Sequence, residues 1–248
     1  MQKLMGSGEL LDAKGHLVER GWAASEVRRY DRAAIGVAHD DPAIKEWDYY
    51  AILTPDFGLA LTVADNGHMG FLGVSWMAFQ ARRFVNGGVG LPAPHGDMNL
   101  PSSADAGDIA HVHPKMQIAF RFAPGGRVLT VDAPDFDKGA GISGEIVLAQ
   151  PPMDRMVIAT PFAEQASAFY YNQKINCMPA SATNSRRQAP SPCSTGAAGS
   201  GPTTTPGTGA PPRAWSTASR SASTSATGSA TRRRPARTSS STTARRTN

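Results

Sequence analysis

The feature that most constrains the fold of this chain is a change in composition after residue 181. Residues 182–248 contain no Val, Ile, Leu, Met, Phe or Tyr, and only a single Trp. A segment with so little apolar surface cannot bury enough of it to offset the conformational entropy lost on ordering. We therefore expect a folded β domain in residues 1–181 and a disordered, low-complexity tail of Arg, Ser, Thr, Pro and Gly in residues 182–248.

The charges of the chain divide at the same point. All 20 acidic residues lie in residues 1–181, together with 15 of the 25 Lys and Arg, which gives this part a net charge of −5. The positive net charge of the whole chain comes from the Arg residues of the tail. Because an acidic surface repels a phosphate backbone, we expect no nucleic-acid partner.

Other global features are typical of a soluble cytoplasmic protein. The opening MQKLMGSGELLDAKG lacks the apolar core of a signal peptide, and no apolar run approaches the ~18 residues of a membrane span. Cys177 is the one cysteine of residues 1–181, so no disulfide framework is expected. We expect a cytoplasmic location and no membrane span.

Alternating apolar runs predict strands from residue 46 onward. EWDYYAILTP is one strand, and SAFYYNQKINCMPAS closes the domain with another. Between them lie three predicted hairpins, which turn at residues 65–67, at residues 124–126 and at Pro151-Pro152. In the first of these, Asn66-Gly67 fits a type I′ turn.

The remaining segments are predicted to be irregular. Residues 1–45 contain short elements, with one helical turn at ASEVRR, and residues 86–114 form a long loop rich in Gly, Pro, Asp and His. Since no segment has a long 3.6-residue period, the fold class is all-β, an antiparallel barrel or sandwich.

The genetic code offers a second explanation for the tail. Suppose that each true codon begins at the third base of a written codon. The last two bases of the true codon are then the first two bases of the next written codon. The TC of Ser then gives Phe, Leu, Ile or Val, and the AC of Thr gives Tyr, His, Asn or Asp. Displaced in this way, residues 192–210 and 213–231 permit alternating, aromatic β sequence. We therefore expect a frameshift near Ser181, with a natural disordered extension as the alternative.

Three motifs resemble a known family. YYNQKINCMPAS at residues 170–181, IKEWDYYAI at residues 44–52 and the opening LLDAKGHLVERGWA are similar to the bacterial and eukaryotic family named domain of unknown function 2804. The resemblance covers about residues 9–181. Family members continue with a motif of the VLDWGRGVW type, which the written frame lacks and the displaced frame permits.

The family is in turn distantly similar to lipocalin-like proteins, which include carotenoid hydratases and tocopherol cyclase. This similarity implies a lipocalin-like antiparallel barrel or sandwich, incomplete here, around an apolar cleft. It also implies binding or transformation of an apolar small molecule such as a lipid or isoprenoid, and leaves open whether the chain is an enzyme. The alternatives are a non-catalytic structural or interaction β module and a non-functional frameshifted product.

The strand KEWDYY carries the first group of candidate residues. Side chains alternate along a strand, so Glu46, Asp48 and Tyr50 share one face, and Trp47 and Tyr49 share the other. A carboxylate beside aromatic rings is a candidate general acid, because burial disfavours its charged form. Asp48 is the catalytic candidate, and Trp47 and Tyr49 are ligand-binding candidates. The favoured alternative is structural, with one wet face and aromatic packing on the other.

The second group lies in the closing strand. Alternation places Tyr170, Asn172, Lys174 and Asn176 on one face, where they could line a pocket and orient an apolar ligand. In the structural alternative, the Asn side chains satisfy backbone groups at a turn. The catalytic candidates of this group are Tyr171 and Lys174, and the ligand-binding candidates are Tyr170, Asn172 and Asn176.

Neither a metal nor a cofactor is expected. His111 and His113 share a strand face and could bind zinc with His95, Asp97, Asp105 or Asp108, but the loop has no second metal motif. The Gly-rich stretches lack the strand–loop–helix context of a phosphate site. Cys177 has no base beside it in the sequence, so we expect a buried structural thiol.

Overall fold

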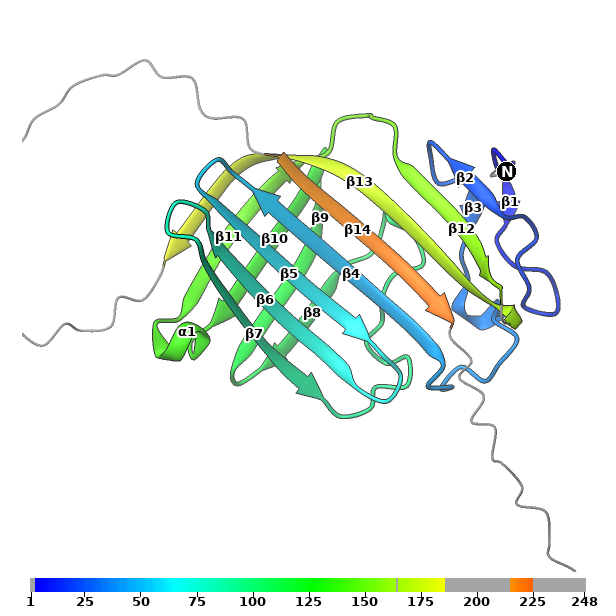
Figure 1. Ribbon diagram of the computed structural model, residues 1–248, viewed down its shortest axis with the longest axis horizontal. Coiled ribbons are helices and arrows are strands. Elements are labelled where there is room, and N and C mark those ends of the chain that lie inside the picture. Colours follow the sequence, from blue (N-terminus) through cyan, green and yellow to red (C-terminus); the bar gives the residue numbers. More distant parts are fainter. Residues whose placement is uncertain (1–2, 164, 186–214, 225–248) are drawn as a thin grey trace, which may run out of the picture.

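The computed structural model describes residues 3–163, 165–185 and 215–224 (Figure 1). Nearly all of its elements are strands, which confirms the all-β fold class. One sheet runs through the strands in the order β7-β6-β5-β4-β14-β13-β11-β10-β9-β8, with β12 and β2 attached beside β13. Within the described residues the two end strands of this path do not pair with each other, so the sheet is not closed into a barrel.

The sheet folds into two layers, one in front of the other in Figure 1. The front layer contains β4 (Ile44–Leu53), β5 (Phe57–Asp65), β6 (Gly70–Ala78) and β7 (Arg83–Leu91). The rear layer contains β8 (Ile109–His113), β9 (Met116–Ala123), β10 (Gly126–Ala133) and β11 (Ile142–Ala149), with the short α1 (Phe136–Gly139) between the last two. Leu61, Leu72, Ile118 and Leu129 are at most 1 % exposed in the core between the layers.

The predicted closing strand is β13 (Gln165–Ser185), a curved element that belongs to both layers. Its first half pairs with β12 (Met156–Phe162), and its second half pairs with β11. On the far side of β12 lies the short β2 (Gly21–Ala23). The long strand therefore has two different neighbours along the same edge.

The N-terminal segment is irregular with short elements, as predicted. β1 (Gly8–Glu9) pairs in parallel with β3 (Arg28–Arg29), and η1 (Arg32–Ala34) follows. The helical turn predicted at residues 24–29 is wrong, because its last two residues are used in that pairing. This segment forms a second core with the inner face of β12 and β13, where Tyr30 stacks on Tyr171 with ring centroids 6.3 Å apart.

Two of the three predicted hairpins are confirmed, β5–β6 and β9–β10. The type I′ turn is wrong: Asp65 pairs with Gly70, so the loop has four residues, and of Asn66 and Gly67 only Gly67 has a positive φ, of 74°. The Asp65 carboxylate accepts a hydrogen bond from Gly67 N at 2.8 Å, and this local bond stabilises the wider turn.

The third predicted hairpin is wrong. Within the described residues β11 and β12 do not pair with each other, and each pairs with a different part of β13. The loop predicted at residues 86–114 is also too long, because its first residues belong to β7 and its last to β8. A Gly-rich strand such as β7 is tolerated at the end of the sheet path, where it has one neighbour.

One segment of the compositionally distinct tail is part of the sheet. β14 (Trp215–Thr224) lies between β4 and β13 and is antiparallel to both. β13 itself extends to Ser185, slightly past the expected domain boundary at residue 181. Residues 186–214 and 225–248 lie outside the described residues, so the disorder expected for them stays a prediction.

Candidate functional site

The candidate site lies where β13 changes neighbours. Its ladder with β12 ends at Lys174, and its ladder with β11 begins at Met178. Among the described strands, none pairs with residues 175–177 along that edge. The connection between β11 and β12, residues 150–155, diverges from β13 here because its two ends belong to different layers. A gap opens between the connection and the strand.

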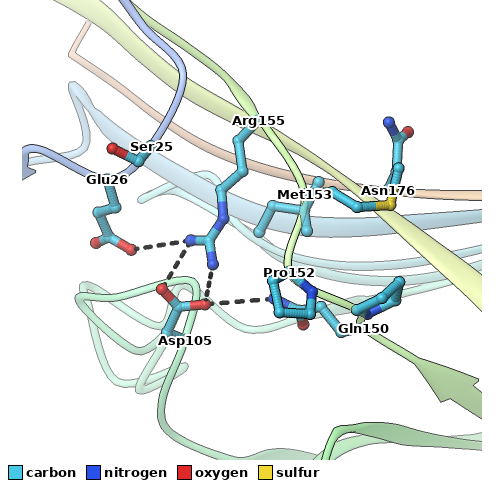
Figure 2. Close-up of a pocket in the computed structure, with 10 residues that line it drawn as sticks. Ser25, Glu26, Asp105, Gln150, Pro152, Met153, Arg155 and Asn176 are labelled. Atoms are coloured by element: carbon cyan, nitrogen blue, oxygen red, sulfur yellow. Dashed lines mark hydrogen bonds and ion pairs between the residues drawn. The ribbon is translucent and has the colours of Figure 1, made fainter.

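This gap is a cleft of about 510 Å³. One wall is apolar and consists of Pro151, Pro152, Met153 and Ile175. Ser25, Glu26, Asp105, Gln150, Arg155 and Asn176 complete the lining, and Figure 2 shows these side chains around the opening. The lining therefore comes from three connections that are far apart in the sequence and from one edge of β13.

Arg155 organises the polar wall. Its Nη1 donates to Asp105 Oδ2 at 2.7 Å, its Nη2 donates to Asp105 Oδ1, and Glu26 Oε2 lies 3.8 Å from Nη1. Figure 2 shows the guanidinium between the two carboxylates. Burial is the largest single influence and raises the pKa of Asp105, but the hydrogen bonds and charge of Arg155, together with smaller contributions from Gln150 and Arg127, hold this pKa below its ordinary value. The charges of this wall are thus paired with one another.

Glu26 also fixes the loop that carries Asp105. Its Oε2 accepts hydrogen bonds from Ser103 Oγ at 3.0 Å and from Ala104 N at 3.2 Å. Gln150 Nε2 donates to Asp105 Oδ1 at 3.3 Å from the opposite side. These bonds hold the three connections in one arrangement.

The polar network continues from the cleft into the core through Arg127 of β10. Arg127 is 5 % exposed, and its Nε donates to Gln150 Oε1 at 3.0 Å. Nη1 donates to the Tyr50 hydroxyl and Nη2 donates to Ala104 O. The guanidinium also lies over the Phe122 ring, 4.6 Å from its centroid. Among the described residues no carboxylate forms an ion pair with Arg127.

Two titratable groups lie near this buried cation. Burial raises the pKa of Tyr50, and Arg127 offsets only part of that rise. Burial likewise raises the pKa of Cys177, which is fully buried on β13. Both groups are therefore neutral near pH 7, and neither is an activated nucleophile. The cavity beside Asp48, Tyr50 and Arg127 has a volume of only about 10 Å³, too small for an organic ligand.

The alternation predicted for β4 is confirmed, but the expectation that its carboxylate face is wet is wrong. Glu46 and Asp48 are each 6 % exposed, and Tyr50 is 2 % exposed. Trp47 and Tyr49 lie on the opposite face and are half-buried. Glu46 is stabilised inside by Tyr30, whose hydroxyl donates to Oε1 at 2.5 Å, and by an ion pair with Arg32. The N-terminal segment, which contacts Glu46, and β10, which contacts Tyr50 through Arg127, decide the burial.

The candidates in β13 are divided between two faces. Asn176 is the one predicted site residue that lines the cleft. Lys174 is exposed, Tyr170 packs against Trp47 with ring centroids 6.1 Å apart, and Asn172 is buried. Tyr171 faces the second core, where its hydroxyl donates to Arg28 O at 3.2 Å. The structure thus does not bring the predicted candidates together in one pocket.

The histidines of β8 make local contacts. His111 Nε2 lies 3.0 Å from Met98 O, and His113 Nδ1 lies 3.2 Å from the amide nitrogen of Lys115. In the part of the chain that the structure describes, no group of three or more His, Cys, Asp and Glu side chains is placed to hold a metal ion.

Sequence reasoning missed Arg155, Glu26, Gln150 and Arg127, and considered Asp105 only as a metal ligand. Arg127 could have been noticed in the sequence, because it is a basic residue that follows the turn of a strongly apolar hairpin. The other residues come from separate loops, and their spacing in the sequence contains no pattern.

Comparison with known proteins gives a family match. The family described as "Domain of unknown function (DUF2804)" matches residues 1–195, which extends beyond the resemblance seen in the motifs. No curated protein and no solved structure matches the chain. Within the described residues, none of the helices has the length and apolar character needed to cross a membrane.

Proposed function

We propose that this chain, which belongs to the DUF2804 family, binds an apolar small molecule with an uncharged polar end in the cleft beside β13. The observation that carries this proposal is the division of the cleft into an apolar wall and a wall of paired charges. Lipids and isoprenoids that end in a hydroxyl or carbonyl group have this chemistry.

The apolar wall supports a hydrocarbon chain or ring system. Met153 is 46 % exposed and shares the lining of the cleft with Pro151, Pro152 and Ile175. Covering such side chains with a ligand removes apolar area from water, worth about 25 cal/mol per Å². Methionine also adapts its shape to different apolar partners, which favours binding of a class of ligands.

The polar wall favours an uncharged end group. A charged head group would have to separate Arg155 from Asp105 or remain without a partner in a partly dry cleft, and both cost free energy. A hydroxyl needs only a hydrogen bond. Asp105 has a side chain that is 49 % exposed, so an oxygen atom of its carboxylate can accept one without loss of the ion pair.

Calorimetric titration with decanol, decanoate and decylammonium tests this proposal, because the three probes share one chain length. Decanol should bind most tightly. Met153→Glu should weaken its binding at least tenfold, since the new charge lies on the apolar wall. The matched control is Met156→Glu, at a methionine that is 47 % exposed on β12 and does not line the cleft. No binding of decanol, or equal losses in both variants, would contradict the proposal.

The second candidate is the non-catalytic interaction module. Phe84 on β7 is 63 % exposed and Val112 on β8 is 79 % exposed, and both strands end the described path of the sheet. Apolar side chains on strands of this kind favour pairing with another chain. If Phe84→Lys abolishes a cellular phenotype while Met153→Glu leaves it unchanged, the interaction module is favoured over the ligand-binding protein.

The remaining parts of the proposal rest on charge and cysteine content. We retain a cytoplasmic location, because a lone buried thiol such as Cys177 needs no oxidising compartment. We also retain the absence of a nucleic-acid partner, on the net charge of residues 1–181.

A further inference from the structure

A second depression adjoins the polar wall of the cleft. It is a groove of about 470 Å³ lined by the paired strands β1 and β3, by Val27 and Ser103, and by two residues that also line the cleft, Glu26 and Asp105. Figure 2 shows these two carboxylates on either side of the Arg155 guanidinium. Because the cleft and the groove share Glu26 and Asp105, a ligand whose apolar part lies in the cleft can extend past them into the groove.

The groove is more polar than the cleft. Val27 is the one large apolar side chain among the described residues that line it, and the cleft has a whole wall of such residues. A hydrocarbon chain would therefore bury little apolar surface in the groove, whereas it buries such surface against Met153 and Ile175 in the cleft. The polar end of a ligand that spans both depressions belongs in the groove.

The charged side chains of the groove are already paired. Arg29 Nη2 donates to Glu9 Oε1 at 2.6 Å. Arg28 forms an ion pair with Glu19, and the two carboxylates shared with the cleft face Arg155. A charged head group would compete with these ion pairs, and the free energy needed to separate them disfavours its binding. The groove therefore favours an uncharged head group.

Both a donor and an acceptor remain in the lining. Oε2 of Glu26 takes the two hydrogen bonds from the Asp105 loop and the contact with Arg155, which leaves Oε1 as an acceptor. Arg29 uses Nε and Nη2 for Glu9, which leaves the N–H groups of Nη1 as donors. Within the described residues neither Glu26 Oε1 nor Arg29 Nη1 has a hydrogen-bond partner. A hydroxyl group can donate to the first and accept from the second, whereas a carbonyl oxygen can only accept.

We propose that the ligand of the cleft has an uncharged head group with several hydroxyls, and that the groove binds this head group. The inference rests on the proposed function and adds the class of the head group. The sugar of a glycolipid and the glycerol of a monoacylglycerol share this chemistry. The hydrocarbon part lies against the apolar wall of the cleft, and the hydroxyls lie beyond Asp105, beside Glu26 and Arg29.

Calorimetric titration with decanol, decyl glucoside and monodecanoylglycerol tests the inference, with each probe kept below the concentration at which it forms micelles. At least one of the two polyhydroxyl probes should bind about tenfold more tightly than decanol, because one or two additional hydrogen bonds give about this factor. A gain for decyl glucoside alone identifies a sugar as the head group, and a gain for monodecanoylglycerol alone identifies glycerol.

Arg29→Met removes the donor of the groove at an exposed position outside the cleft lining. It should abolish most of the tighter binding of the polyhydroxyl probe and leave the affinity for decanol unchanged. Arg20→Met is the matched control, at an exposed arginine that lines neither depression, and should change neither affinity.

The outcomes separate the inference from the proposed function. If decanol binds but neither polyhydroxyl probe binds more tightly, the inference is overturned and the proposed function stands. Equal affinities of Arg29→Met and Arg20→Met for the polyhydroxyl probe would also overturn the inference. If decanol does not bind, the proposed function fails and the inference fails with it.

Discussion

Arg155 binds Asp105 across 50 residues of sequence, with Nη1 and Nη2 on the two oxygens of one carboxylate. The pair joins the connection after β11 to the loop before β8, and so closes the polar wall of the cleft. A two-fold hydrogen bond of this kind fixes the planes of both groups as well as their distance.

The first prediction concerns this pair. Asp105→Asn should lower the free energy of unfolding by about 0.5–1 kcal/mol, the range of a partly exposed ion pair. Denaturant titration at pH 7 measures the loss. Asp108→Asn, at an exposed carboxylate outside the cleft lining, is the control and should have a smaller effect. Equal losses in the two variants would contradict a specific role for the pair.

The second prediction concerns pH. The pKa of Asp105 is lower in the folded protein than its ordinary value of 3.8, so its ionised form stabilises the fold above that value. This contribution should be lost as the pH falls below about 4 and through the lowered pKa. Unfolding curves between neutral and acid pH should therefore fall more steeply for the unmodified chain than for Asp105→Asn. Parallel curves would show that the pairing does not shift this pKa.

The third prediction concerns the buried cation. Arg127→Met should cost about 2–4 kcal/mol, because it leaves the Tyr50 hydroxyl, Gln150 Oε1 and Ala104 O without their donor inside the core. Arg121→Met, at an exposed position of β9, should change stability by less than about 0.5 kcal/mol. Chemical denaturation of both variants tests the difference.

The fourth prediction concerns Glu46. Glu46→Ala removes the acceptor of the Tyr30 hydroxyl and the partner of Arg32, and should release the N-terminal segment from β4. Hydrogen exchange in residues 3–36 should accelerate more than exchange in β9 and β10. Uniform acceleration would indicate global destabilisation instead, and Glu46→Gln, which keeps one acceptor oxygen, should have a smaller effect.

The fifth prediction concerns Cys177. Its thiol is fully buried and its pKa is raised by burial, so alkylation by iodoacetamide should be negligible at neutral pH and complete in denaturant. Mass analysis of the peptide that contains Cys177 provides the measurement. Rapid alkylation of the folded chain would contradict the structural role of this thiol.

Part of the fold follows from local patterns. Alternation identified β4 and assigned Glu46, Asp48 and Tyr50 to one face, and turn residues located the β5–β6 and β9–β10 hairpins. These predictions succeed because side-chain alternation and tight turns depend on residues that are neighbours in sequence.

Tertiary structure decided which face of β4 is buried and which strands pair. Alternation separates two faces but does not say which one another segment will cover, and here the N-terminal segment and β10 cover the carboxylate face. Pro151-Pro152 looked like a hairpin turn, but β11 and β12 both pair with β13, which lies far along the chain. The cleft and its Arg155–Asp105 pair exist because of that divergence, and long-range pairing of this kind depends on the packing of the whole chain, which no local pattern contains.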